Sequence, residues 1–312
     1  MTTHHPLVPN VNNGPTLVIS CGILEGIMLI LYAVRMYGRF HPARNLWWDD
    51  YAVSFAVALS VTAYALRVVA TRYGIGRHNS FITQKGQIQA QKYIFIVSCL
   101  WYFGVAFMRI SVAFLLLRFR NSQRPSWALV LYIVIVTQFV LAVAALVIQI
   151  TMCRPTRAFW EPVEDFRCLP ALFSQVWGYC HTGLGIFTDL LLSAMPITFV
   201  LRMNILLWNR IVICFLMAAG LWTAATAMVK TVHIAQFTAA SGDTLWHMYF
   251  LTFWSQLEEV IGIIAACIPC IKARVEALLR SFGVISISST VEAPLNTFPP
   301  NSIHYQTEMS IT

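Results

Sequence analysis

Seven apolar segments, each long enough to cross a lipid bilayer as a helix, constrain this sequence more than any other feature. They lie between charged or turn-rich stretches, at about residues 16–37, 48–70, 93–117, 127–150, 172–201, 211–235 and 246–271. A helix of about 20 apolar residues spans the hydrocarbon core, where every backbone polar group must be satisfied internally. The sequence therefore predicts an all-α membrane protein folded as a seven-transmembrane-helix bundle.

The composition agrees with a chain that is mostly surrounded by lipid. Charged residues make up 11% of the chain and hydrophobic residues 58%, whereas soluble domains carry about 25% charged residues. A soluble enzyme, a disordered regulator and a disulfide scaffold are excluded. The net charge of the chain is +8. Binding of nucleic acid would require a basic face on a soluble domain, and the sequence predicts no such domain. The positive charge therefore indicates attraction to anionic lipid headgroups.

The distribution of basic residues predicts the orientation and the domain organisation. Residues 1–15 form an extracytoplasmic stub, residues 16–271 the transmembrane domain, and residues 272–312 a largely disordered cytoplasmic tail with a short amphipathic piece at 274–279. Loops on the cytoplasmic side are expected to be richer in Lys and Arg, and this rule favours an N-terminus outside. We expect a multi-pass protein of the plasma membrane or an endomembrane. The short inner loops carry Arg118, Arg120, Arg124, Arg202 and Arg210.

Two of the eight cysteines flank a loop between the fourth and fifth apolar segments. Cys153 and Cys168 lie on the outer side in the predicted topology, where oxidation is permitted. We favour a disulfide between them, which would hold a loop over the outer mouth of the bundle, with two free thiols as the alternative.

Ionisable residues within the apolar segments are the most informative part of the sequence. Each costs about 2.5–3.5 kcal/mol at the bilayer centre on insertion scales, so each is expected to be paired, to face the bundle interior or to serve a function. Six positions near the bilayer centre qualify, and they are Glu25, Arg109, Asp189, Lys230, Glu258 and Glu259. Asp49 and Asp50 lie at the start of the second segment, just inside the interface.

Helical spacing and depth suggest partners for four of these residues. Asp189 lies on a stripe of small and polar residues that recur at intervals of three and four, which is typical of a face packed against other helices. Similar depths favour the pairs Arg109–Asp189 and Lys230–Glu258, with Glu25 near the second pair. Such a set is either a structural polar network or part of a ligand-binding or acid–base site, because an unpaired buried carboxylic acid could donate a proton.

Several familiar sites are not expected in this sequence. The seventh segment has no lysine before Lys272, so the middle of that helix offers no Schiff-base partner and retinal is not expected. No spacing of His, Cys, Asp or Glu indicates a metal site, and no Gly-rich phosphate loop or nucleophile elbow indicates a cofactor or an acyl-transfer site.

An ordered set of short motifs over about 255 residues resembles the fungal rhodopsin-domain integral membrane family, which includes the satratoxin-cluster membrane protein and the Pth-eleven-type receptors. The resemblance implies a rhodopsin-like topology with the N-terminus outside. The motifs are Trp48-Asp49-Asp50-Tyr51, Gly74-Ile75-Gly76-Arg77-His78, Cys153-Arg154-Pro155 with Trp160 and Cys168, Thr188-Asp189-Leu190 with Pro196, Trp254-Ser255 with Glu258 and Gly262, and Cys267-Ile268-Pro269.

Two departures from that family pattern bear on function. Family members usually have a lysine before a serine in the third helix, where this chain has Arg109-Ile110-Ser111; arginine can bind a carboxylate through two parallel hydrogen bonds, unlike lysine. The Cys-rich extracellular domain of the receptor branch is missing, which leaves the branch found among secondary-metabolite gene clusters.

Three functions remain open at this point. A receptor-like protein would bind a small lipophilic molecule between its helices, near the aromatic residues Trp101, Tyr102, Trp177 and Trp246, and would contact a cytosolic signalling partner through Arg118, Arg120 and Arg124. A membrane enzyme, an acid-catalysed cyclase or isomerase, would use Asp189 and Glu258 on a lipophilic pathway intermediate. Export of a metabolite ranks third, because no internal repeat is visible.

Overall fold

The computed structural model of the chain describes residues 12–41, 46–118, 125–195, 217–232 and 244–281, and helices account for most of them. Seven helical stretches coincide with the seven apolar segments. Five of them are long and apolar enough to cross a membrane. The helices are α1 (Gly14–Phe40), α2 (Trp48–Arg72), α3 (Gln84–Arg118), α4 (Pro125–Thr151), α5 (Ala171–Ala194) and α8 (Thr244–Ser281), with a further helix at residues 217–232.

Two helices are longer than the apolar runs that predict them. α3 begins at Gln84 rather than near residue 93, because the polar stretch that precedes the apolar run is also helical. At about 1.5 Å per residue, the 35 residues of α3 extend about 52 Å, well beyond a hydrocarbon core of about 30 Å. α8 continues past Pro269 to Ser281, so the expected tail starts as helix. Pro196 and residues 282–312 lie outside the described part of the chain.

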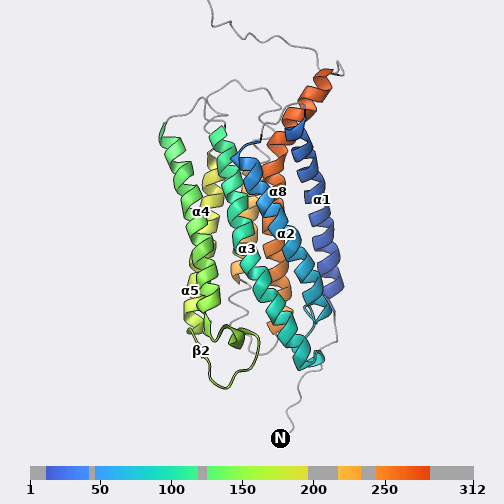
Figure 1. Cartoon of the computed structure of the whole chain (residues 1–312), viewed down its shortest axis with the longest axis vertical. Coiled ribbons are helices and arrows are strands. Elements are labelled where there is room, and N and C mark those ends of the chain that lie inside the picture. Colours follow the sequence, from blue (N-terminus) through green and yellow to red (C-terminus); the bar gives the residue numbers. More distant parts are fainter. Residues whose placement is uncertain (1–11, 42–45, 119–124, 196–216, 233–243, 282–312) are drawn as a thin grey trace, which may run out of the picture. The chain divides into compact units, whose positions relative to one another are not determined.

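The chain divides into two compact units, Met1–Arg274 and Val275–Thr312. Within the first unit the helices lie side by side and successive helices run in opposite directions (Figure 1). α3 packs along both α2 and α4. One apolar core joins α1, α2, α3 and α8 around Met28, Val53, Val105 and Val260. A second core joins α3, α4 and α5.

The outer faces of the helices carry large apolar side chains. Ile30, Leu129, Val136 and Phe187 are each more than 60% exposed. In water such faces would form apolar patches larger than soluble monomers usually carry, whereas in a bilayer they contact lipid tails. Apolar side chains exposed on the outer faces and packed between the helices together indicate a membrane-embedded helix bundle.

A glycine-containing turn joins three helices at one end of this unit. Gly74 and Gly76, between α2 and α3, have φ angles of +121° and +85°, a region that side chains with a Cβ rarely adopt. The Gly76 amide donates to the carbonyl of Leu245 in α8 at 3.5 Å, and its carbonyl accepts from the amide of Asn13 before α1 at 3.0 Å. The turn therefore connects the start of α1 and the start of α8 to the end of α2.

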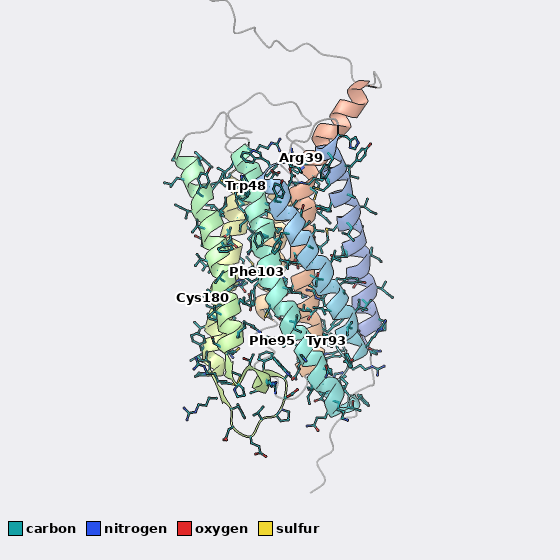
Figure 2. The ribbon with its side chains drawn as sticks, in the orientation of Figure 1. Arg39, Trp48, Tyr93, Phe95, Phe103 and Cys180 are labelled. Carbon is teal, nitrogen blue, oxygen red and sulfur yellow. A yellow bond between two sulfur atoms is a disulfide. The ribbon has the colours of Figure 1, made fainter. Side chains whose placement is uncertain are left out.

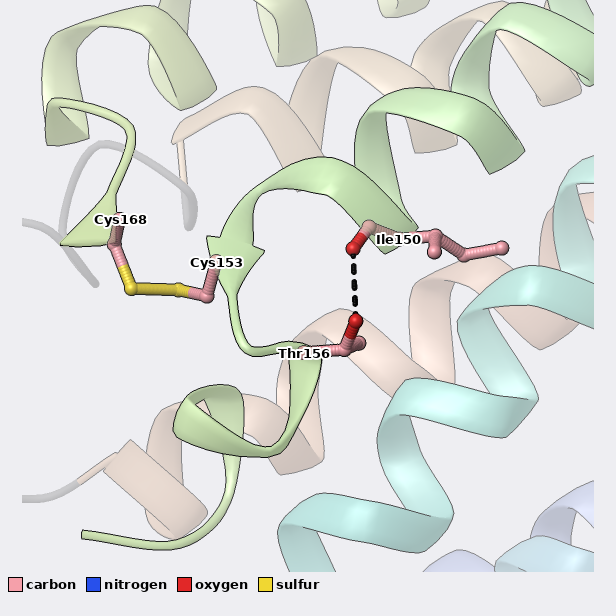
Figure 3. Close-up of a disulfide and its surroundings, with 4 residues drawn as sticks. All are labelled: Ile150, Cys153, Thr156 and Cys168. Atoms are coloured by element: carbon pink, nitrogen blue, oxygen red, sulfur yellow. Dashed lines mark hydrogen bonds between the residues drawn. A yellow bond between two sulfur atoms is a disulfide. The ribbon is translucent and has the colours of Figure 1, made fainter. Parts of the chain in front are cut away.

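The loop between α4 and α5 lies at the same end (Figure 1). Cys153 and Cys168, which the sequence suggested as partners, form a disulfide between two short antiparallel strands, β1 (Cys153–Arg154) and β2 (Arg167–Cys168). The Thr156 hydroxyl donates to the carbonyl of Ile150 at 3.2 Å (Figure 3). A 3-10 helix, η3 (Thr156–Phe159), follows β1.

Aromatic contacts connect this loop to α3. The ring of Phe95 lies 5.2 Å from that of Phe159 and 5.3 Å from that of Trp160, and it points toward the loop in Figure 2. The loop is thus held by a covalent bond at its base and by ring packing at its tip, over the end of the bundle.

The close contact between α3 and α8 gives a test of the packing. A Cβ at Gly104 would collide with the Glu259 carboxylate, so Gly104→Ala should lower the free energy of unfolding by about 1–3 kcal/mol. Gly26→Ala is the control, because a Cβ at Gly26 meets nothing within 4 Å. Thermal unfolding of the purified protein in detergent, followed by circular dichroism, measures both. Equal midpoints for the two variants would contradict the packing.

Candidate functional site

An ionic network of four residues connects four helices at the centre of the bundle. The Arg109 guanidinium on α3 donates from Nε to Asp189 Oδ1 at 2.9 Å and from Nη2 to Asp189 Oδ2 at 3.0 Å. Nη2 also donates to Glu258 Oε1 on α8 at 3.1 Å. The Lys230 ammonium, from the helix at 217–232, donates to Glu258 Oε2 at 2.7 Å. Both pairs that depth suggested are formed, and Arg109–Glu258 joins them into one network.

All four side chains of this central network are buried. Two cations and two carboxylates give it no net charge, which reduces the cost of placing charge in a low-dielectric interior. Gly185 on α5 makes room for the larger guanidinium, since a Cβ there would lie 3.0 Å from Arg109 Nη2. Arginine at this position therefore makes the two-bonded contact with Asp189 that a lysine could not make.

A cavity of about 470 Å³ lies between this network and the α4–α5 loop. Its volume falls in the range of about 300–1,000 Å³ typical of small-molecule sites. The side chains that surround it come from α2, α3, α4, α5, the helix at 217–232, α8 and the loop. Of the 21 described lining residues, ten have apolar or aromatic side chains, ten have polar or charged side chains and one is glycine. They include Arg67, Trp101, Tyr102, Trp177, Gly178, His181 and Lys230.

Aromatic rings and one ammonium group are arranged around this cavity. Lys230 Nζ lies 4.1 Å from the ring centroid of Trp101, close enough for a cation–π interaction, and the Trp101 indole donates to the carbonyl of Ser255 at 3.0 Å. The His181 ring lies edge-on to that of Tyr102, with 5.2 Å between centroids. Lys230 thus belongs to both the cavity wall and the central network.

Sequence reasoning found part of this cavity. Trp101, Tyr102 and Trp177 line it, whereas Trp246 stacks on His78 with 4.3 Å between ring centroids. His181 was missed as a lining residue, although it lies one turn from Trp177 on α5. Their i, i+4 spacing was the signal that could have placed both on one face.

Asp189 borders a much smaller space. A cavity of about 50 Å³ lies beside Arg109 and Asp189, which is room for water and too little for a metabolite. Asp189 and Glu258 both accept hydrogen bonds in ion pairs, so neither is the unpaired acid that proton donation to a substrate requires. The acid-catalysis hypothesis therefore gains no support from the geometry.

Glu25 belongs to a different group of residues from the central network. Its Oε2 accepts from Ser60 Oγ at 3.3 Å and from Gln256 Nε2 at 2.6 Å. Arg67 and Glu259 interact electrostatically with each other, and Arg67 also with Glu25. We call Glu25, Ser60, Arg67, Gln256 and Glu259 the second polar cluster.

A third ionic group, which the sequence analysis missed, lies at the end of the bundle opposite the disulfide loop. Arg35 Nη2 lies 2.7 Å from Asp49 Oδ2 and 2.8 Å from Asp50 Oδ1, and Arg39 Nη2 lies 3.1 Å from Asp49 Oδ2. Figure 2 shows Arg39 at this end, away from Phe95. The signal was two arginines one turn apart in the first segment, close to two acids opening the second.

The same acidic pair also contacts α3. Ser111 Oγ donates to the Asp49 carbonyl at 2.9 Å, and Arg118 Nη1 lies 4.0 Å from Asp49 Oδ1. Arg120 and Arg124 lie outside the described residues. Among the residues that the structure describes, no three His, Cys, Asp or Glu side chains gather in a way that could hold a metal ion.

The fold and the cavity define a helical membrane protein with a cavity between its helices. The model of the fungal rhodopsin domain matches residues 34–277. The match covers most of the chain, so this protein belongs to the fungal rhodopsin domain family. No curated protein matches the chain.

The shared carboxylate of the central network gives a second prediction. Glu258→Gln leaves two buried cations and one carboxylate, so it should lower the free energy of unfolding by about 3–5 kcal/mol. Adding Lys230→Met restores neutrality and should recover part of that loss. Thermal unfolding in detergent measures both, with Glu161→Gln at an exposed loop position as the control. If Glu258→Gln matched that control, the network would not be a stabilising unit.

Proposed function

We propose that this protein is receptor-like and binds a small lipophilic molecule in the cavity between its helices. The observation that carries the proposal is the cavity of about 470 Å³ lined by Trp101, Tyr102 and Trp177. Flat aromatic rings bind apolar and aromatic molecules over a large area, and the polar side chains around them would orient the ligand. The disulfide-bonded loop contributes Phe159 to the same wall.

The proposed membrane arrangement is seven crossings with the N-terminus outside. Seven helical stretches in the described part of the chain support it, and successive stretches run in opposite directions (Figure 1). α5, which carries Gln175, His181 and Asp189, is not among the five helices that are long and apolar enough to cross a membrane. In this orientation the disulfide loop faces an oxidising compartment, and the ligand would enter from that side.

The central network is the proposed route by which a ligand acts on the rest of the bundle. Lys230 lines the cavity, and through Glu258 it connects to Arg109 and Asp189. A ligand that draws the Lys230 ammonium group away from Glu258 would weaken that ion pair and leave Glu258 paired with Arg109 alone. The contacts among the four helices that carry the network would then change. A cytosolic signalling partner would bind at the end of the bundle opposite the disulfide loop, where Arg118 lies close to Asp49, and would respond to that change.

The biological setting that we propose is secondary-metabolite (mycotoxin) biosynthesis, at the plasma membrane or an endomembrane. It rests on the resemblance of the motifs to a family that includes the satratoxin-cluster membrane protein. A binding protein fits the geometry better than a cyclase or isomerase, because the large cavity lacks a carboxylate among its described lining residues and the carboxylates Asp189 and Glu258 are held in ion pairs.

The cavity can be filled to test the proposal. Gly178 lines it, and a Cβ there meets nothing within 4 Å, so Gly178→Phe should occupy the space without disturbing the helix. The probe is pyrenebutanol, a neutral aromatic lipophile whose pyrene accepts energy from tryptophan. We expect saturable energy transfer in the wild type. Gly178→Phe should bind pyrenebutanol at least about tenfold more weakly than the wild type, which corresponds to a loss of about 1.4 kcal/mol in binding free energy.

Gly183→Phe is the matched control on the same helix. A Cβ at Gly183 also meets nothing within 4 Å, but this residue is exposed and does not line the cavity. It should bind pyrenebutanol as the wild type does. Absence of saturable transfer in the wild type, or equal affinities for the two phenylalanine variants, would refute binding in this cavity.

A further inference from the structure

Arg67 is a buried cation on the wall of the cavity, and two of the three nitrogens of its side chain have no hydrogen-bond acceptor among the described residues. Its side chain lies on α2, the residue is 3% exposed, and it lines the cavity together with Ile94 and Trp101. No described residue accepts a hydrogen bond from its buried Nε or Nη1. A guanidinium has five N–H donors, and leaving buried donors unpaired is costly.

The nearby carboxylates do not meet this need. Glu25 is occupied through Oε2 by Ser60 and Gln256, and its Oε1 has no partner. Glu259 packs against Gly104, and neither of its oxygens accepts a hydrogen bond from a described residue. Both acids attract Arg67, which helps to keep a cation at this depth, but no direct ion pair joins them.

The charge on the cavity wall has one sign. The described lining residues include two cations, Arg67 and Lys230, and no carboxylate. Lys230 already donates to Glu258 at 2.7 Å and lies over Trp101. Arg67 is the one of these two cations that has no described carboxylate within ion-pair distance, and a carboxylate is the group that a guanidinium binds best, through two parallel hydrogen bonds.

We propose that Arg67 is an anion-binding residue of the cavity and that the ligand is a lipophilic carboxylic acid, bound as its carboxylate with its apolar part against the aromatic wall. This inference rests on the proposed function, because it names the chemical class of the molecule bound there. The proposal also gives the orientation of the ligand. Its carboxylate would lie near α2 and α3, and its apolar part would extend toward Trp177 on α5.

A series of probes that differ only in their polar end tests the inference. Pyrenebutyrate, pyrenebutanol and pyrenebutylamine share the same ring and chain and carry a carboxylate, a hydroxyl and an ammonium group. With full-length protein in phosphatidylcholine nanodiscs, energy transfer from tryptophan gives the three affinities. Pyrenebutyrate should bind about tenfold or more tightly than pyrenebutanol, because a charge-assisted pair replaces a neutral one, and pyrenebutylamine should bind most weakly.

Variants of Arg67 assign the preference to this residue. Arg67→Gln should remove the advantage of pyrenebutyrate while pyrenebutanol still binds, and Arg67→Lys should keep part of it because the charge remains without the paired donors. Arg72→Gln, an exposed position one turn further along α2, removes the same charge from the protein and should leave the advantage unchanged.

The outcomes separate this inference from the proposed function. If pyrenebutanol binds, is lost in Gly178→Phe and matches pyrenebutyrate in the wild type, the cavity is a ligand site without an anion preference, and the inference fails alone. An advantage of pyrenebutyrate that survives in Arg67→Gln also overturns it. If Arg67→Gln does not fold, the comparison of the three probes in the wild type still decides whether the cavity prefers an anion.

The same anion could belong to a free acid or to a membrane lipid. Replacing part of the phosphatidylcholine by phosphatidylglycerol distinguishes these sources. Affinity for pyrenebutyrate that is independent of phosphatidylglycerol identifies a free lipophilic acid, as proposed. Competition by phosphatidylglycerol overturns that identity and assigns the site to a lipid headgroup.

Discussion

The cost of placing charge inside a membrane shapes the interior of this protein. Four helices meet at Arg109, Asp189, Lys230 and Glu258, and each charge there is acceptable only because an opposite charge lies within hydrogen-bonding distance. Unlike apolar contacts, which tolerate sliding of one helix along another, these pairs have defined partners and distances. The network therefore sets the register of α3, α5, the helix at 217–232 and α8. Its Lys230 side chain also lines the cavity.

The cavity combines features that would be unfavourable separately. A cavity near the end of a bundle could be filled by larger side chains at little cost, and a Cβ at Gly178 would meet nothing within 4 Å. Arg67 and Lys230 place positive charge on its wall. An empty apolar space costs packing energy, and a guanidinium without acceptors costs more. The proposed lipophilic acid would offset both costs.

The candidate site was only partly predictable from the sequence. Pattern and depth placed Asp189 and Glu258 inside and suggested their cations, because helical periodicity depends on the sequence alone. Glu25 was grouped with Lys230 by depth, yet it bonds to Ser60 and Gln256, since depth says nothing about which side of the bundle a helix occupies. Arg35, at the end of the first predicted segment, was not among the charges predicted to be buried, although it is 1% exposed and paired with Asp49 and Asp50.

The sequence by itself determined that this chain enters a membrane and that seven stretches of it are helical, because apolar length and the requirement for internal backbone hydrogen bonds leave no other solution. It also indicated six of the charges that are buried. Only the tertiary structure decided which charges meet, because lateral packing brings together residues as distant as Arg109 and Glu258. The cavity and the position of Arg67 on its wall likewise depend on the space that packed helices leave between them. That space cannot be predicted from the spacing of residues along one helix.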